Sequence, residues 1–210
     1  MTDSLDLFSQ TALDRLPIAG ADIRFMHHLF TPQEADGIFD ALLHSIAWRH
    51  DEITIYGKKV LQPRLTAWYG DAGTYYQYSG LPLAPNPWTD LLLSLKARVE
   101  DVTDTRYNSV LLNLYRDGKD SVGWHSDNES ELGSEPVIAS VSFGQTRTFQ
   151  LKPKNQPGAI TTRIELTHGS LLVMRGATQR NFLHAVMKSS KIDRPRINLT
   201  FRTIAIQAPK

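Results

Sequence analysis

The stretch Tyr115-Arg-Asp-Gly-Lys-Asp-Ser-Val-Gly-Trp-His-Ser-Asp127 follows an apolar segment at 110–114 and ends with a histidine and an aspartate two residues apart. In extended backbone, side chains two residues apart point the same way. We therefore expect the imidazole of His125 and the carboxylate of Asp127 to project into one space. Two ligands do not complete a metal site, and the best third candidate is His184, in a strand-like segment much later in the chain.

Two histidines and one carboxylate form the facial ligand set of non-haem Fe(II) sites, which leaves open positions for oxygen chemistry. The sequence therefore predicts an iron site. The absence of cysteine excludes disulfides and thiolate ligands.

Length and composition are those of one globular domain, 1–210, with a core of its own. The formal net charge of +1 means that any affinity for nucleic acid has to come from a local basic patch. Residues 1–20 read as a loosely attached lead-in without the features of a signal peptide, and no apolar run is long enough to span a membrane. We expect a monomer located in the cytoplasm, or in the nucleus in a eukaryote.

Two helices are expected before the main set of strands. Thr31-Pro-Gln-Glu34 has the pattern of a capping box with proline in the first turn, and apolar residues follow at helical spacing. A second amphipathic helix is expected at about 88–102. Between them, 48–70 favours strands joined at a Tyr-Gly-Lys-Lys turn, and 71–87, with three prolines, favours a loop.

From residue 107 onward the pattern predicts short strands at even spacing, at 108–116, 137–143, 147–152, 162–166, 170–174, 181–187 and 196–206. Such a series is typical of a closed or sandwiched β architecture, with the helices covering one outer face. The fold class is α+β.

The last strand has two different faces. Arg196, Asn198 and Arg202 alternate with apolar residues, so one face has two guanidinium groups and an amide. If this face points to solvent, its polar residues need no further explanation. If it points into the mouth that holds the metal, it forms a pocket for a small dianion, because arginine binds carboxylates bidentately.

The chain resembles the AlkB family of Fe(II)- and 2-oxoglutarate-dependent dioxygenases over about 48–206. The resemblance rests on six motifs: Asn113-Leu-Tyr115, His125-Ser-Asp127, Val141-Ser-Phe-Gly-Gln-Thr-Arg147, His168-Gly-Ser-Leu-Leu-Val-Met174, His184 and Arg196-Ile-Asn-Leu-Thr-Phe-Arg202. It implies a double-stranded β-helix (jelly-roll) core at 107–206, N-terminal helices on one face, and a nucleotide-recognition lid at 48–95. The implied activity is oxidative dealkylation of N-alkylated bases such as 1-methyladenine and 3-methylcytosine in DNA, with release of formaldehyde from methyl lesions.

The resemblance also implies roles for single residues. The iron ligands would be His125, Asp127 and His184, with O2 as the second co-substrate. Arg196 would bind the distal carboxylate of 2-oxoglutarate, and Arg202 would lie near its 1-carboxylate and Asp127. The remaining co-substrate pocket would be formed by Asn113, Tyr115 and Asn198.

Substrate contacts are implied in the lid and beside the metal. Tyr76 or Tyr78 would stack on a flipped base, and Glu129 would accept a hydrogen bond from its exocyclic amine. Tyr56 occupies the tip of a hairpin that resembles the finger of duplex-repair members, and Arg64 is a candidate phosphate contact. Asn128 and Tyr56 depart from the residues of some duplex-repair members, which leaves base and strand preference open.

Other functions remain open at this stage. The same iron core would suit an RNA demethylase or a hydroxylase of proteins or small molecules. A catalytically silent nucleic-acid-binding module is a third reading, which the intact ligand set disfavours. A zinc hydrolase is disfavoured because no general base is evident and the arginine pair would have no role.

Overall fold

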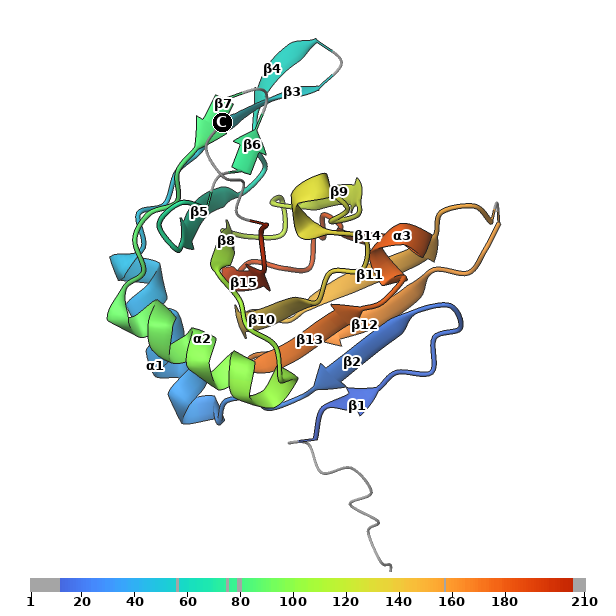
Figure 1. Ribbon diagram of the computed structural model, residues 1–210, viewed down its shortest axis with the longest axis horizontal. Helices are drawn as coiled ribbons and strands as arrows, with labels where there is room; N and C mark the ends of the chain where they lie inside the picture. The colour runs from blue at the N-terminus through green and yellow to red at the C-terminus, as the bar shows by residue number, and fades with distance from the viewer. Residues whose placement is uncertain (1–11, 56, 75, 79–80, 157, 206–210) are drawn as a thin grey trace, which may run out of the picture.

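Two antiparallel sheets of unequal size form the body of the protein, seen here in a computed structural model (Figure 1). The structure describes residues 12–55, 57–74, 76–78, 81–156 and 158–205, with 53–55, 76–78 and 81–83 described by their backbone alone. Within these residues, the larger sheet has the strand order β1-β2-β13-β10-β15-β8-β5. Its strands are β1 (Asp14–Arg15), β2 (Asp22–Met26), β13 (Ser170–Arg175), β10 (Ile138–Gly144), β15 (Arg196–Arg202), β8 (Ser109–Tyr115) and β5 (Leu65–Gly70).

The smaller sheet faces the larger one and has the order β12-β11-β14-β9. Its strands are β12 (Thr162–Leu166), β11 (Arg147–Pro153), β14 (Phe182–Val186) and β9 (Val122–His125). Two short segments adjoin it, η1 (Ser130–Leu132) and α3 (Thr178–Asn181). The α+β prediction is confirmed, and the two antiparallel sheets are consistent with a jelly roll.

Successive side chains of β15 point to opposite faces of the larger sheet, and the two faces pack in two separate layers of the core. Ile197, Leu199 and Phe201 pack towards the helices in one apolar cluster. The opposite face points into the space between the sheets, where a second apolar cluster includes Phe149, Leu172 and Val186. In β15 this inward face has Arg196, Asn198 and Thr200, all buried. Charged and amide groups therefore lie inside the sandwich, which is the orientation under which the sequence predicted a ligand pocket.

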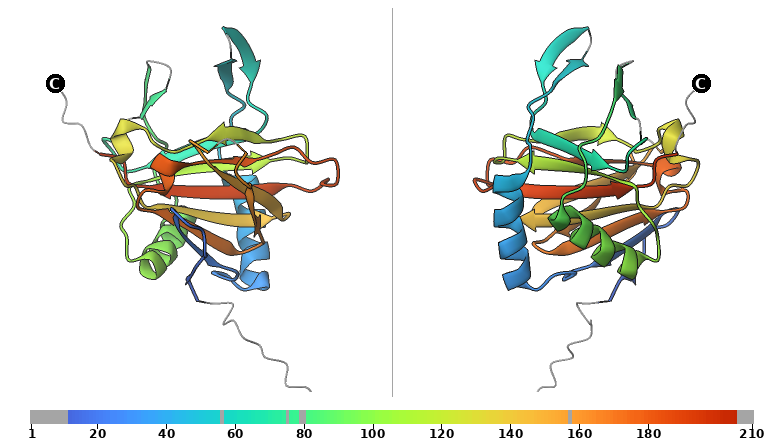
Figure 2. Two further views of the ribbon diagram at one scale, coloured as in Figure 1. Left: turned by 90° about the vertical axis from the view of Figure 1, so that its right-hand side faces the viewer. Right: turned by 60° about the vertical axis from the view of Figure 1, so that its left-hand side comes forward.

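Both helices cover the outer face of the larger sheet (Figure 2). α1 (Pro32–Ser45) starts at Thr31, whose side chain accepts a hydrogen bond from the backbone of Glu34 while the Glu34 carboxylate accepts one from the Thr31 backbone. The predicted capping box is confirmed. α2 (Asp90–Thr103) is capped by Thr89. The buried leucines and valine of α2 join the same apolar cluster as the strands beneath it.

One expectation about an irregular segment is wrong, and another is tested only in part. Residues 12–20 of the expected lead-in contain β1, which pairs with β2 at the edge of the larger sheet, and the rest of the lead-in, 1–11, lies outside the described residues. The loop expected over 71–87 contains a hairpin of β6 (Tyr76–Tyr78) and β7 (Leu81–Leu83). Pro82 lies within β7, which is compatible with a strand because this sheet has only two strands in the described residues, so β7 needs no second partner.

A second hairpin, of β3 (Glu52–Ile55) and β4 (Lys58–Leu61), confirms the strands and turn expected near residue 57. Both hairpins stand out from the body on the same side (Figures 1 and 2). No helix in the described ranges is long and apolar enough to cross a membrane.

Candidate active site

The three predicted metal ligands converge. His125 is the last residue of β9, Asp127 follows it, and His184 lies in β14 directly opposite His125 in the strand register. One ligand atom from each residue lies within 4.8 Å of the others, and the two imidazole ring centroids are 4.2 Å apart. Strand pairing therefore brings together residues that are distant in the chain, and the expected convergence is confirmed.

The two imidazoles are held in orientations that suit a metal. His184 is 5% exposed and stacks on Phe149 at 5.2 Å. Burial, together with His125, lowers the pKa of His184 to about 3, so this imidazole is neutral at physiological pH. The Nδ1 atom of His125 lies 2.8 Å from the carbonyl oxygen of Gly123, which favours a proton on Nδ1 and leaves Nε2 to bind a cation.

The carboxylate of Asp127 is buried and paired. Burial alone would raise its pKa, but the neighbouring guanidinium of Arg202 and the two histidines outweigh that effect and keep the pKa below its usual value. Arg202 Nη2 lies 2.9 Å from Asp127 Oδ2. The backbone N–H of Asp127 donates to Oε1 of Gln179 at 2.9 Å. Both the side chain and the backbone of this ligand are thereby fixed.

The inward face of β15 adjoins these ligands. Arg202, at one end of this face, contacts Asp127, and Arg196 lies on the same face six residues earlier. Arg196 is 1% exposed, and its Nη2 donates to Ser142 Oγ at 2.9 Å. Its Nε and Nη1 have no hydrogen-bond partner within the described ranges. Burial lowers its pKa to about 10, so the group remains a cation at neutral pH.

A buried cation with two unused donors fits an anionic ligand, since unpaired buried donors are costly. The register places Tyr115 opposite Arg196, and Asn113 opposite Asn198, so these four residues form one polar patch. A donor set of two imidazoles and a carboxylate, with a guanidinium on the adjoining strand, therefore suits Fe(II) and a dicarboxylate.

The other predicted residues are placed less directly. Arg64 Nε donates to Asn113 Oδ1 at 2.7 Å, so Arg64 adjoins the polar patch, and its contact with a phosphate stays a prediction. Asn198 donates to Ser140 Oγ and accepts from Thr200 Oγ1. Glu129 lies two residues beyond Asp127 and is partly buried. The side chains of Tyr76 and Tyr78, and all of Tyr56, lie outside the described residues, so their roles stay predictions.

Four further residues belong to the site and were not predicted. Ser140 and Ser142 line the inward face of β10, and their alternation with apolar residues was the signal that could have identified them. Gln179 and Arg147 contact the site from segments far away in the sequence. Arg147 stands in one of the family motifs, but nothing in the pattern indicated what it contacts.

Comparison with known proteins agrees with this geometry. The model of the 2OG-Fe(II) oxygenase superfamily matches residues 22–202. Alpha-ketoglutarate-dependent dioxygenase alkB homolog 3 of Mus musculus is 47% identical over 180 residues, a match that covers 82% of this chain and 62% of that protein. DNA oxidative demethylase ALKBH2 of Homo sapiens is 40% identical over 187 residues, covering 85% of this chain and 72% of that protein.

The chain thus spans less than two thirds of the length of the alkB homolog 3 relative. A solved structure described as the structure of OsALKBH1 superposes with a TM-score of 0.58 at 15% identity, covering 86% of this chain and 96% of that one, and so shares the fold. With a family model that matches most of its length and with close relatives, the chain belongs to the AlkB family of the 2OG-Fe(II) oxygenase superfamily.

Proposed function

We propose that this protein is an Fe(II)- and 2-oxoglutarate-dependent dioxygenase that repairs N-alkylated bases in DNA. Lesions of the 1-methyladenine and 3-methylcytosine type would be dealkylated, with formaldehyde released from methyl groups. Relatives named as a DNA oxidative demethylase and as alpha-ketoglutarate-dependent dioxygenases support this proposal. The proposal depends on one observation. The inward face of β15 carries both Arg202, which contacts Asp127, and Arg196, whose guanidinium is partly unpaired.

Each group then has a defined task. His125, Asp127 and His184 would hold the iron, and Arg196 would bind the distal carboxylate of 2-oxoglutarate. When bound, the iron and 2-oxoglutarate supply the means to hydroxylate an N-methyl carbon with O2. Arg202 keeps Asp127 ionised and oriented. Asp127 and His184 are both buried, which would limit the access of water to this chemistry.

The two projecting hairpins are the proposed recognition lid. An N-methyl group on the Watson–Crick edge is inaccessible inside a duplex, so the nucleotide has to be flipped out. Tyr56, which directly follows β3 in the sequence, is the proposed finger, and β4 begins with the exposed Lys58 and Lys59. Hairpin β6–β7 would present Tyr76 or Tyr78 for stacking, worth about 1–3 kcal/mol per base. Glu129 would accept from the exocyclic amine.

The test measures formaldehyde release and 2-oxoglutarate turnover with Fe(II) and ascorbate on oligonucleotides that contain 1-methyladenine or 3-methylcytosine, and the binding of 2-oxoglutarate is measured separately. Single-stranded DNA, duplex DNA and RNA of matched sequence are assayed side by side. Asp127→Ala should abolish release, whereas Asp193→Ala, at an exposed aspartate in another loop, should not change it.

The outcomes separate the alternatives. Release from DNA that Asp127→Ala abolishes supports repair, and a preference for RNA would instead make the protein an RNA demethylase. Turnover of 2-oxoglutarate without formaldehyde release from any nucleic acid would support the assignment as an oxygenase and reject nucleic acid as its substrate. Failure to bind 2-oxoglutarate at all would reject the oxygenase.

A further inference from the structure

A second buried guanidinium lies behind the proposed co-substrate pocket and has no task so far. Arg147, the first residue of β11, is 2% exposed. Its Nη1 donates to the carbonyl oxygen of Asp117 at 3.2 Å, and its Nη2 donates to those of Asp120 and Met187 at 2.9 and 2.8 Å. Burial lowers the pKa of Arg147 from its ordinary value. The charge of Arg147 is therefore stabilised inside the protein by three backbone carbonyls and by the nearby carboxylates of Asp117 and Asp120.

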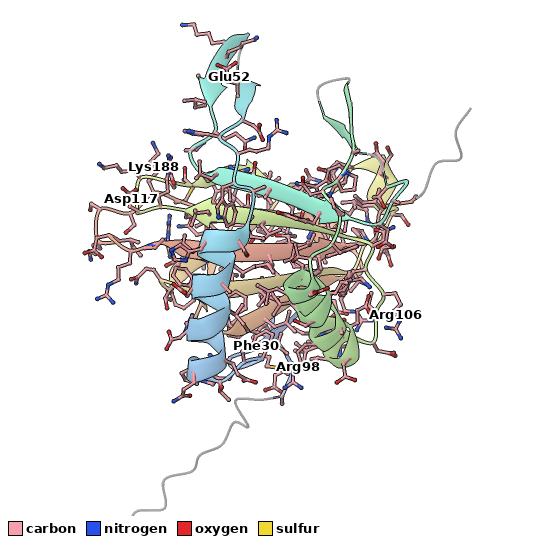
Figure 3. The ribbon with its side chains drawn as sticks, turned by 90° about the vertical axis from the view of Figure 1, so that its left-hand side faces the viewer. Phe30, Glu52, Arg98, Arg106, Asp117 and Lys188 are labelled. Carbon is pink, nitrogen blue, oxygen red and sulfur yellow. The ribbon has the colours of Figure 1, made fainter. Side chains whose placement is uncertain are left out.

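These carbonyls belong to the two loops that adjoin the metal-binding strands. Asp117 and Asp120 lie between β8 and β9, the strand that ends at His125, and Met187 directly follows the strand of His184. The loops meet at one end of the molecule, where Figure 3 labels Asp117 and Lys188.

Backbone hydrogen bonds join these two loops. Gly118 N–H donates to the carbonyl of Ile192 at 2.9 Å, and Ser189 N–H donates to that of Gly118 at 2.8 Å. Any side chain at Gly118 would collide with the backbone of Ser189. The carbonyls that receive Arg147 are therefore held in place.

Arg147 also contacts the proposed co-substrate pocket through an aromatic ring. Its guanidinium lies 5.4 Å from the ring centroid of Tyr115, and the guanidinium of Arg196 lies 5.1 Å from the same centroid. Both distances fall within the range of cation–π contacts. Tyr115 is 3% exposed, so the ring is confined by two cations inside the sandwich.

We infer that Arg147 is a positioning residue for the dicarboxylate co-substrate, acting through Tyr115. Its hydrogen bonds to three carbonyls fix the guanidinium, the guanidinium fixes the Tyr115 ring, and the ring sets the position of Arg196. This inference rests on the proposed function, because it assigns the pocket of Arg196 to 2-oxoglutarate. Lysine cannot replace Arg147, since one ammonium group lacks the planar fork that reaches three acceptors while lying over a ring.

The first experiment measures binding, not turnover. Protein loaded with Mn(II) is titrated with 2-oxoglutarate by calorimetry, for the wild type, Arg147→Lys and Glu100→Gln. The last variant is a stability control, because Glu100 lies in a separate ion-pair network on α2. Arg147→Lys should raise the Kd for 2-oxoglutarate about tenfold, the order expected for loss of a buried cation–π contact. The Kd for Mn(II) should change less than about threefold, and Glu100→Gln should change neither constant.

A double-mutant cycle tests whether Arg147 acts through the ring. Tyr115→Leu should weaken 2-oxoglutarate binding by itself, and adding Arg147→Lys to that variant should have little further effect. Full additivity of the two changes would contradict the inference, as would an unchanged Kd in folded Arg147→Lys.

A third measurement needs no substitution at Arg147. In Zn(II)-loaded wild-type protein, the side-chain Nε–H resonance of Arg147 should shift when 2-oxoglutarate is added, and the shift should be lost in Tyr115→Leu. A resonance that does not respond, in protein that binds 2-oxoglutarate, would overturn the inference and leave the proposed function intact. Wild-type protein that binds no 2-oxoglutarate would instead overturn the proposed function.

Discussion

Gln179 shows how one uncharged side chain can control a metal ligand. It is 2% exposed, accepts from the backbone N–H of Asp127, and donates through Nε2 to the sulfur of Met174 at 3.2 Å. Its own backbone carbonyl accepts from Lys154 Nζ at 2.8 Å. The short helix α3 is thereby attached on one side to the turn that follows β11 and on the other to the segment of Asp127.

Gln179→Ala should therefore weaken metal binding. The Asp127 backbone would lose its acceptor and the carboxylate its fixed direction, and loss of such supporting contacts typically costs about 10- to 100-fold in metal affinity. Calorimetric titration with Mn(II) measures the effect, and Gln156→Ala, at an exposed glutamine, is the matched control. Equal affinity in the two variants would show that Asp127 does not depend on this contact.

At the residue scale, the sequence predicted the groups whose chemistry is distinctive and missed those whose role is set by neighbours. The spacing of His125 and Asp127 is a local property, as is the alternation along β15. The contact of Gln179 with Asp127 spans 52 residues and depends on how α3 packs. No local pattern marks a glutamine for that position.

Helix α2 ends in a charged network that contributes to stability. Glu100 is 7% exposed and lies 2.9 Å from Lys96 Nζ and 2.8 Å from Arg106 Nη1, and it accepts from the backbone N–H of Tyr107. Burial would raise its pKa, but these partners together lower it below the usual value of 4.5. The carboxylate thus joins α2 to the segment that leads into β8.

Glu100→Gln should reduce the free energy of unfolding at pH 7 by about 1.5–3 kcal/mol, the range for buried hydrogen bonds to a charged group. Because the folded pKa is lowered, this stabilisation is present above pH 4.5 and is lost as the pH falls through the folded pKa. Urea unfolding at pH 7 and below pH 4 measures the effect. The difference in the free energy of unfolding between the wild type and Glu100→Gln should be smaller at the lower pH. Glu165→Gln, at an exposed position of β12, should show no comparable gap.

At the element scale, helices were predicted better than short strands. The capping box and apolar periodicity of α1 are contained within one segment, so the start of this helix can be predicted from the local sequence. β1 has only two residues, and its strand identity comes entirely from pairing with β2. Three prolines favoured a loop over 71–87, yet two short strands pair there because each needs only one neighbour.

The charge of the whole molecule places limits on how it can attract nucleic acid. With a formal net charge of +1, long-range attraction is weak and local cations have to supply it. Lys58 and Lys59 are exposed on a hairpin that projects beyond the body, the segment that begins near Glu52 in Figure 3. Arg98 lies on α2, at the opposite end of the molecule in the same view.

Reversing the charge of both hairpin lysines, in the double variant Lys58→Glu with Lys59→Glu, should weaken binding to DNA of any sequence. The slope of log affinity against log salt should fall by about one to two, according to how many phosphate contacts are lost. Fluorescence anisotropy at several salt concentrations measures the slope. Arg98→Glu should leave it unchanged, and an equal effect of the two variants would argue against the hairpin as a contact.

The position of β9 gives the metal a mechanical role. β9 is the edge strand of the smaller sheet, joined to β14 by a ladder with an irregularity between His184 and Val186. An ion bound by both His125 and His184 would link β9 to β14 next to the irregular part of this ladder. Chelation should therefore cause the edge to fray, visible as faster amide hydrogen exchange in β9 while β10 and β13 stay protected. The local order of β9, the strand that ends at His125, would then depend on whether iron is bound.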